Sequence, residues 1–194
     1  MRPKTFDEAA ALRLAMVQFW ESGYAGSSMQ SLVERMGISR QSLYDTFGNK
    51  RELFRSALEM YFDEHIRPMI DALERGDRQA PDAVRGYLRS IAEISNDVPA
   101  GCLIVRTATE VSPDDQVIGE MLESCLTPLR EALARVVARG QQEGQVGSGR
   151  SAGHWARSIL NFGMGLHVAR RLPDRGVDSA ASIEAFMDGL RPAA

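Results

Sequence analysis

The sequence predicts an all-α protein. Apolar residues recur at helical spacing over most of the 194 residues. The alternating runs of Val, Ile, Thr and Tyr that indicate strands are missing from the sequence. Hydrophobic residues make up 44% and charged residues 25%, which is typical of a soluble globular protein. We expect about nine helices: an N-terminal three-helix helix-turn-helix domain, followed by a helical-bundle domain.

The first four helices are separated by short end signals. The segment Gly23-Tyr24-Ala25-Gly26 breaks the first helix, and Ser27 or Ser28 can cap the second through its hydroxyl. Gly37 ends the second helix, and Ser39 caps the third. Gly48-Asn49 forms a turn before the fourth. The expected helices run over residues 6–21, 27–36, 39–47 and 50–66.

Proline residues mark most of the starts, ends and kinks expected in the remaining helices. Pro68 should end or kink the fourth helix, and Pro81 suits the first turn of the next. The segment Ser112-Pro113-Asp114-Asp115 is a strong start signal, because it combines a capping hydroxyl, an early proline and acids that favour the helix dipole. Pro128 should kink the helix that follows. The expected helices run over residues 81–94, 102–111, 112–139, 151–172 and 179–190.

Composition excludes several classes of protein. Two cysteines cannot form a disulfide framework, so we expect a reducing compartment and a cytoplasmic location. No apolar run approaches the roughly 20 residues that span a bilayer, so we expect no membrane partner. The N-terminus has no apolar core behind its basic residues, which argues against a signal peptide.

Residues 27–50 have the pattern of a helix-turn-helix. Two short helices meet at a tight turn around Gly37, and apolar residues are spaced to pack the pair together. These residues are Leu32, Val33, Met36, Ile38 and Leu43. A short helix of this kind fits the major groove, where its first turns reach the base edges.

Polar residues on this segment are the predicted contacts to double-stranded DNA. Arg suits guanine, Gln suits adenine, and Tyr suits a phosphate or a thymine methyl group. Serines and backbone N–H groups at a helix start can hold a phosphate. The predicted set is Ser27, Ser28, Ser39, Arg40, Gln41, Ser42, Tyr44, Asp45 and Lys50.

The charge distribution agrees with this prediction. The whole chain has a net charge of -3, which by itself disfavours nucleic acid as a partner. Residues 35–55, however, contain five basic and two acidic residues, a local net charge of +3. The rest of the chain is therefore at -6. Such asymmetry points weakly to nucleic acid. On pattern alone, a helical hairpin with a solvated polar face remains the alternative.

Residues 23–54 closely resemble the signature of the TetR family of bacterial transcriptional regulators. The matching elements are Gly23-Tyr24, Ser27-Ser28, Gly37-Ile38-Ser39, Leu43-Tyr44, Phe47, Lys50 and Leu53. Gln41 replaces the family's common Gly, and Asp45-Thr46 replaces the frequent His-Tyr. Asp45 would repel a phosphate, and its carboxylate could instead accept a hydrogen bond from a cytosine amino group.

The resemblance implies a homodimeric regulator, most simply a repressor, that binds a palindromic operator. Residues 1–50 would bind DNA, and residues 51–194 would bind a small-molecule effector and form the dimer. The implied dimer interface comprises Trp155, Ile159, Phe162, Gly163, Leu166, Ile183, Phe186, Met187 and Leu190. Candidate residues for lining the effector pocket are Phe62, Ile66, Tyr87, Ile91, Cys102, Arg106, Cys125, Leu129 and Phe162. The pocket residues could equally be plain core. The two terminal helices could also simply close the core of one subunit, but the dimer is favoured, because a helix-turn-helix gains affinity by pairing across half-sites.

Other functions have less support. Cys102 lies at an expected helix start, where a thiol pKa can be lowered, so a redox sensor is conceivable; a buried packing role is favoured. The three histidines are far apart, so no metal site is expected, and no cofactor motif or catalytic triad is recognised. We therefore expect no enzyme. The alternative function is a helical small-molecule-binding or redox-sensing protein with weak or no operator binding.

Overall fold

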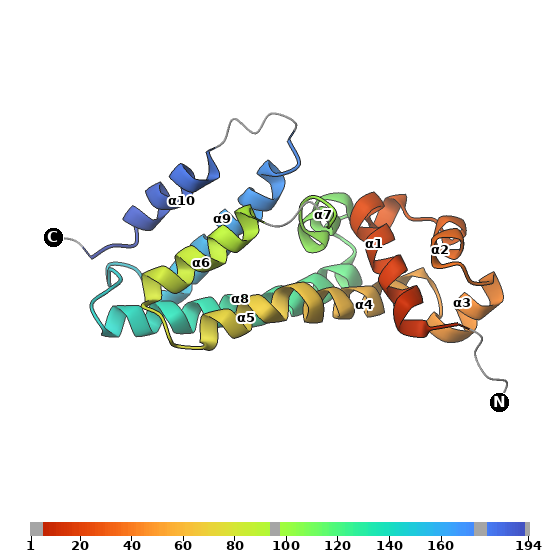
Figure 1. The fold of residues 1–194 in the computed structure, drawn as a ribbon, viewed down its shortest axis with the longest axis horizontal. Coiled ribbons are helices and arrows are strands. Elements are labelled where there is room, and N and C mark those ends of the chain that lie inside the picture. Colours follow the sequence, from red (N-terminus) through yellow and green to blue (C-terminus); the bar gives the residue numbers. More distant parts are fainter. Residues whose placement is uncertain (1–5, 94–97, 173–177, 193–194) are drawn as a thin grey trace. The chain divides into compact units, whose positions relative to one another are not determined.

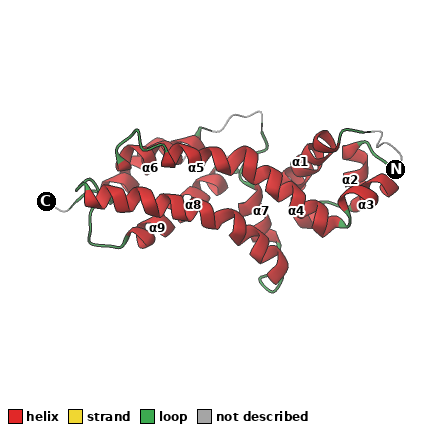
Figure 2. Cartoon of the chain, turned by 90° about the horizontal axis from the view of Figure 1, so that it is seen from below, coloured by secondary structure: helices red, strands yellow, loops and turns green. Residues whose placement is uncertain are grey.

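The computed structural model describes residues 6–93, 98–172 and 178–192, and this part of the chain is helical with no strand. Figures 1 and 2 show helices joined by loops. The predicted all-α fold is therefore confirmed. Within the described residues, no helix is both long enough and apolar enough to cross a bilayer. The helices are α1 (Glu8–Gly26), α2 (Met29–Met36), α3 (Arg40–Phe47), α4 (Lys50–Tyr61), the π-helical turn η1 (Phe62–Ile66), α5 (Arg67–Glu74), α6 (Ala80–Ala92), α7 (Leu103–Glu110), α8 (Gln116–Gln142), α9 (Ala152–Ala169) and α10 (Ser179–Asp188).

The chain forms two compact units. The first combines Met1–Glu64 with Cys102–Cys125, so α7 and the start of α8 pack with α1 to α4. The second combines His65–Gly101 with Leu126–Ala194, which includes α5, α6, most of α8, α9 and α10. Each unit has its own core.

Helix α1 is interrupted at Gly23, as the sequence predicts. Asp7 caps its start by accepting a hydrogen bond from the backbone N–H of Ala10. Gly23 has φ 80° and ψ 168°, a conformation that is essentially restricted to glycine. A side chain at this position would also overlap the carboxylate of Glu110 on α7. Gly23 therefore ends the regular part of α1, and the end of the flexible Glu110 side chain occupies the space beside it.

An aromatic cluster fills the core of the first unit between α1 and α4. The rings of Phe19 and Phe54 meet edge to face with centroids 5.0 Å apart, and both residues are fully buried. Trp20 and Tyr61 meet in the same way at 4.9 Å. Edge-to-face pairs place the positive edge of one ring against the negative face of the other. This packing attaches α1 firmly to α4.

The segment around Pro68 differs in detail from a single helix ending at that proline. Helix α4 passes into the π-helical turn η1, and α5 then starts with Pro68 in its first turn. Proline lacks the N–H that an interior helical position would use, so a new helix start is the position where it costs least. The predicted break is confirmed, and the stretch 50–66 contains the additional π-helical turn.

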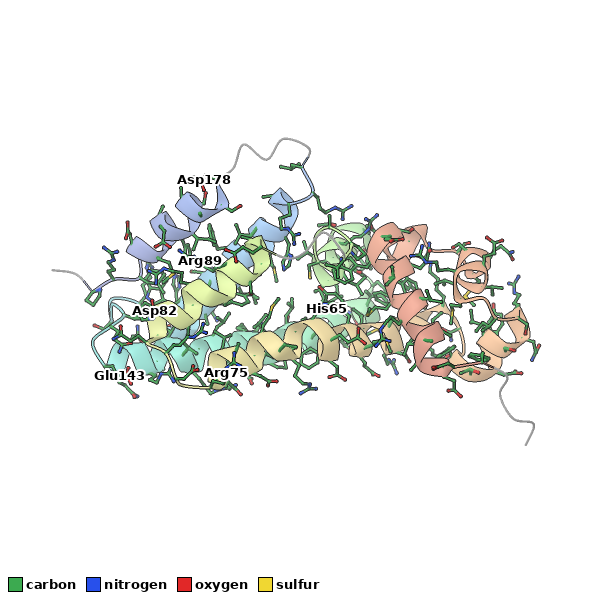
Figure 3. The ribbon with its side chains drawn as sticks, viewed as in Figure 1. His65, Arg75, Asp82, Arg89, Glu143 and Asp178 are labelled. Atoms are coloured by element: carbon green, nitrogen blue, oxygen red, sulfur yellow. The ribbon has the colours of Figure 1, made fainter. Side chains whose placement is uncertain are left out.

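In the second unit, α6 packs against α9 and α10. A side-chain atom at Gly163 would lie 3.0 Å from both the Tyr87 hydroxyl and the Ile91 side chain, so this glycine lets α9 approach α6. The rings of Phe162 and Phe186 stack at 4.6 Å. Arg89 on α6 lies beside α10 (Figure 3), and it donates to Glu184 at 3.0 Å. Helix α6 ends at Ala92, and Ile94, the predicted end, lies outside the described residues.

The core of this unit corrects part of the predicted dimer interface. Six of the nine residues are buried within the chain itself: Ile159, Gly163, Leu166, Ile183, Met187 and Leu190. An apolar helix face looks the same in sequence whether its own subunit or a partner covers it. The other three, Trp155, Phe162 and Phe186, are half-buried and keep some surface for a partner.

His167 is a buried titratable group in α9. It is 8% exposed, and its Nδ1 has no hydrogen-bond partner among the described residues. Burial, followed by the nearby positive charge of Arg170, lowers the pKa of His167 to about 4 from an ordinary 6.5. The neutral imidazole is therefore the form that the fold accepts.

We expect Gly23→Ala to destabilise the protein by about 1–3 kcal/mol, because alanine disfavours this backbone conformation. Gly26→Ala is the matched control. Gly26 lies in the same helix, and its nearest neighbour to a Cβ is 3.9 Å away. The control should change the free energy of unfolding by less than about 1 kcal/mol in urea denaturation. Equal effects of the two substitutions would contradict the role given to Gly23.

We expect stability to fall in acid partly through His167. The unfolded chain binds a proton below pH 6.5 and the folded chain only near pH 4, so the free energy of unfolding falls over this window. The shift corresponds to about 3 kcal/mol. In His167→Gln this part of the pH dependence should disappear, which urea denaturation at pH 7, 5.5 and 4 can measure. Identical slopes for both proteins would refute the assignment.

Candidate nucleic-acid interface

Helices α2 and α3 form a helix-turn-helix with a tight glycine turn. Gly37 ends α2 in the left-handed conformation, with φ 66° and ψ 26°, and its N–H donates to the Val33 carbonyl at 3.1 Å. Ser39 then caps α3 by accepting from the Ser42 N–H at 3.0 Å. The predicted turn and helix ends are confirmed. Three residues, Gly37, Ile38 and Ser39, thus join the two helices.

Apolar side chains hold the two helices together. Leu32 and Leu43 are fully buried and Met36 nearly so. Val33 and Ile38, which the pattern also assigns to this contact, are half-buried. Because the apolar sides of both helices are used internally, their polar sides face solvent.

The exposed side of α3 carries two pairs of residues spaced by one helical turn. The Arg40 guanidinium lies 5.8 Å from the centre of the Tyr44 ring, and Tyr44 is 41% exposed. The Gln41 amide donates to the Asp45 carboxylate at 2.7 Å. Arg40 and Tyr44 therefore form one row on the helix surface, and Gln41 and Asp45 form the next. This arrangement suits base edges, which are distinguished by their donors and acceptors.

The predicted serines fall into different environments. Ser28 and Ser39 are exposed helix caps, and Ser42 is half-buried beside Ser39. Ser27 is a correction: it is fully buried, and its hydroxyl donates to the Gly23 carbonyl at 2.7 Å. Its side chain stabilises the break in α1 and is not available to a phosphate.

The Lys50 side chain, at the start of α4, packs against Tyr24 of α1. Its ammonium lies 4.4 Å from the centre of the Tyr24 ring, and the Tyr24 ring packs on Phe54 at 4.8 Å. Burial lowers the pKa of Lys50. Asn49 caps the helix at this point by accepting from the Arg51 and Glu52 N–H groups. A cation over an aromatic face is held in place, which fixes the lysine at the start of α4.

Ion pairs reduce the number of available cations in the basic segment, and sequence reasoning did not find them. Arg35 pairs with Glu21 at 3.0 Å, and Arg51 pairs with Asp115 at 3.0 Å. Arg40 has no acidic partner within the described residues. Spacings of 14 and 64 residues leave no local signal for such pairs. Arg40 is thus the exposed cation at the centre of the candidate interface.

Comparisons with known proteins identify this architecture. Residues 11–57 match the model of the bacterial regulatory proteins of the tetR family, and residues 81–186 match the tetracyclin repressor-like C-terminal domain. The chain belongs to the TetR family. The prediction made from the motif is confirmed. This is a family of DNA-binding transcriptional regulators and not a class of enzymes.

The relatives cover between three quarters and nearly all of this chain. The transcriptional repressor ComR of Escherichia coli is 31% identical over 96% of this chain and 86% of its own length. The uncharacterized regulator YezE of Bacillus subtilis is 33% identical over 75% of each chain. A cysteine mutant of the TetR-family regulator CifR, solved with a 26-base-pair operator duplex, has a TM-score of 0.86 and 30% identity, covering 98% of this chain and 100% of its own.

One of the predicted pocket residues, Cys125, lines a groove of about 260 Å³ in the first unit. The other residues that line this groove are Arg55, Leu58, Glu59, Val117, Glu120, Met121 and Ser124. The remaining candidates are buried (Ile66, Tyr87, Ile91, Cys102, Leu129) or half-buried (Phe62, Arg106, Phe162). Arg106, which would need an anionic partner if buried, pairs with Glu110 at 2.8 Å. The pocket lining stays a prediction.

The environment of Cys102 disfavours a reactive thiolate. The Tyr61 hydroxyl donates to its sulfur at 3.3 Å, and both groups are buried. Burial raises the pKa of the Cys102 thiol, whereas a redox-sensing cysteine needs a lowered pKa. The position before α7 therefore does not activate the sulfur. Within the described residues, no cluster of three or more His, Cys, Asp or Glu side chains could hold a metal ion.

Proposed function

We propose that this chain is a homodimeric, ligand-responsive repressor that binds a palindromic operator. The observation that carries the proposal is the exposed face of α3, where Arg40 has no acidic partner and lies beside Tyr44 and the Gln41–Asp45 pair. Two relatives support it: ComR is described as a repressor, and CifR is described in complex with operator DNA.

The proposed DNA contacts fall into two groups. Ser28, Ser39 and Lys50 lie at the starts of α2, α3 and α4, where N–H groups and the helix dipole favour a phosphate. Arg40, Gln41, Tyr44 and Asp45 occupy the exposed side of α3 and would enter the major groove. Ser42 is half-buried and would act mainly by supporting Ser39 through their 2.8 Å contact.

The proposed dimer uses the outer sides of α9 and α10. Val168 is 47% exposed and follows Gly165 by three residues in α9, and Leu172, which is 54% exposed, lies just beyond the end of that helix. On α10, Ala181 and Ala185 are exposed one turn apart. Small and apolar residues on adjacent outer faces suit a two-fold helical interface. Dimerisation would place two copies of α3 roughly 34–36 Å apart, one turn of the duplex.

We propose that residues 1–50 bind DNA and that residues 51–194 bind the effector and the second subunit. The effector would favour a conformation in which the two recognition helices no longer match successive grooves. It can do so only by its difference in affinity for the two states. An effector site within the C-terminal region is consistent with the mixed polar and apolar groove beside Cys125.

Arg40→Ala should weaken binding to the operator by roughly 10- to 100-fold, because a base-contacting arginine contributes about 1–3 kcal/mol. Gel shifts at several salt concentrations, with duplexes from the chain's own upstream region, measure the effect. Arg135→Ala is the control: Arg135 is an exposed arginine of the second unit that pairs with Glu74, so the net charge changes equally. Equal binding by both variants would remove Arg40 from the interface, and a chain that binds no duplex specifically would contradict the function itself.

Val168→Glu should dissociate the dimer, because a carboxylate on each subunit would be buried against the partner. Sedimentation should change from a dimer to a monomer of 21.4 kDa at micromolar concentration. Leu14→Glu introduces the same charge at a site on α1 that is 39% exposed, and it should remain dimeric. A dimeric Val168→Glu protein would show that another surface forms the interface.

A further inference from the structure

The two rows on α3 point to a specific base. We propose that Asp45 selects a cytosine in each operator half-site and that Gln41 positions its carboxylate. The inference rests on the proposed function, because it assumes that α3 enters the major groove. It adds the chemistry of one base pair, which neither the fold nor the relatives specify.

The hydrogen bond between Asp45 and Gln41, one turn apart, stabilises α3 only weakly. It is exposed near the C-terminal end of α3, where the helix dipole disfavours a negative charge. Within the described residues it forms no ion pair, and its hydrogen bond is the one from Gln41. An anion on a helix that faces phosphates also costs binding energy through repulsion. Its contribution should therefore be selectivity and not affinity.

Gln41 fixes the direction of the carboxylate. Its amide nitrogen lies 2.7 Å from one oxygen of Asp45. A carboxylate only accepts hydrogen bonds, so the amide N–H must face it, and the amide oxygen then points elsewhere. The second Asp45 oxygen remains available as an acceptor. Because both residues lie one turn apart on a rigid helix, this acceptor is held in place before DNA arrives.

Cytosine is the base that matches such an acceptor. In the major groove its edge presents the N4 amino donor and no acceptor. Guanine presents two acceptors and thymine one, and both would repel a carboxylate. Adenine presents a donor, but its N7 acceptor lies beside it. A carboxylate thus accepts cytosine and disfavours the other three bases at the same position.

The neighbouring row, Arg40 and Tyr44, offsets the repulsion between the Asp45 carboxylate and the DNA phosphates. Arg40 and Tyr44 lie on the adjacent strip of the same exposed side, and Arg40 carries no acidic partner. The positive charge needed for attraction to DNA is therefore beside Asp45 without being neutralised by it. Arg40 would thus attract the DNA backbone, and Asp45 would select the base.

Selection from a random duplex library with the full-length chain tests the inference. Wild type should enrich a palindromic motif with a cytosine in each half. Asp45→Asn should lose the preference at that cytosine alone, because the amide presents a donor as well as an acceptor. Gln41→Ala should weaken the same preference without moving it.

Glu34→Gln is a matched control. Glu34 accepts from Gln30 at 2.7 Å on α2, so the same kind of pair, one turn apart, is altered and the same charge is removed. The control should enrich the wild-type motif. Any general gain in affinity from removing a negative charge should be similar in Glu34→Gln and Asp45→Asn.

A second measurement tests whether the cytosine N4 amino group is the group that Asp45 contacts. Competition binding compares the selected duplex with one in which 2-pyrimidinone, which lacks the amino group, replaces the cytosine. Wild type should lose roughly 10- to 100-fold in affinity. Asp45→Asn should lose less than about threefold.

The outcomes are distinguishable. If wild type enriches no motif, the proposed function fails and the inference fails with it. If wild type enriches a motif but Asp45→Asn leaves every position unchanged, or changes a position that is not cytosine, the inference is overturned and the proposed function stands. A uniform rise in affinity for all sequences in Asp45→Asn, with the preference for cytosine unchanged, would likewise overturn it.

Discussion

The contact between α1 and α4 is the constraint on which the DNA-binding part of the molecule depends. Helices α2 and α3 are each only eight residues long, and isolated helices of this length are not stable in water. They are held because α1 and α4 are joined by the Phe19–Phe54 and Trp20–Tyr61 ring pairs. Tyr24 extends this cluster to Lys50 at the start of α4. Because the aromatic cluster supplies buried apolar surface between α1 and α4, the polar side of α3 can remain exposed to solvent.

Local signals in the sequence were sufficient to predict most of the secondary structure. Gly37, Ser39 and Pro68 act through their own backbone requirements, so their positions determine helix ends regardless of what packs around them. The π-helical turn Phe62–Ile66 is not marked by a residue type of its own, so the sequence predicts only an irregularity at Pro68, which follows it. The family signature extended prediction to function, since it combines many individually weak positions.

Contacts between distant residues could not be predicted. The apolar pattern of α9 indicates a buried face, but Ile159 and Gly163 are covered by the same chain and Val168 is not. Ser27 has the residue type of a phosphate contact, yet its hydroxyl is used by the Gly23 carbonyl. The basic segment likewise contains Arg35 and Arg51, whose charges are compensated by Glu21 and Asp115. Sequence shows the available groups, and packing decides which remain free.

The break at Gly23 combines a local sequence signal with a contact between distant residues. The glycine is needed locally for its backbone conformation, and the carboxylate of Glu110 occupies the space that a side chain would take. Glu110 is itself paired with Arg106 on the same helix. The local role of Gly23 can therefore be predicted from the sequence. Its neighbour Glu110 cannot, because α7 lies about 80 residues further along the chain.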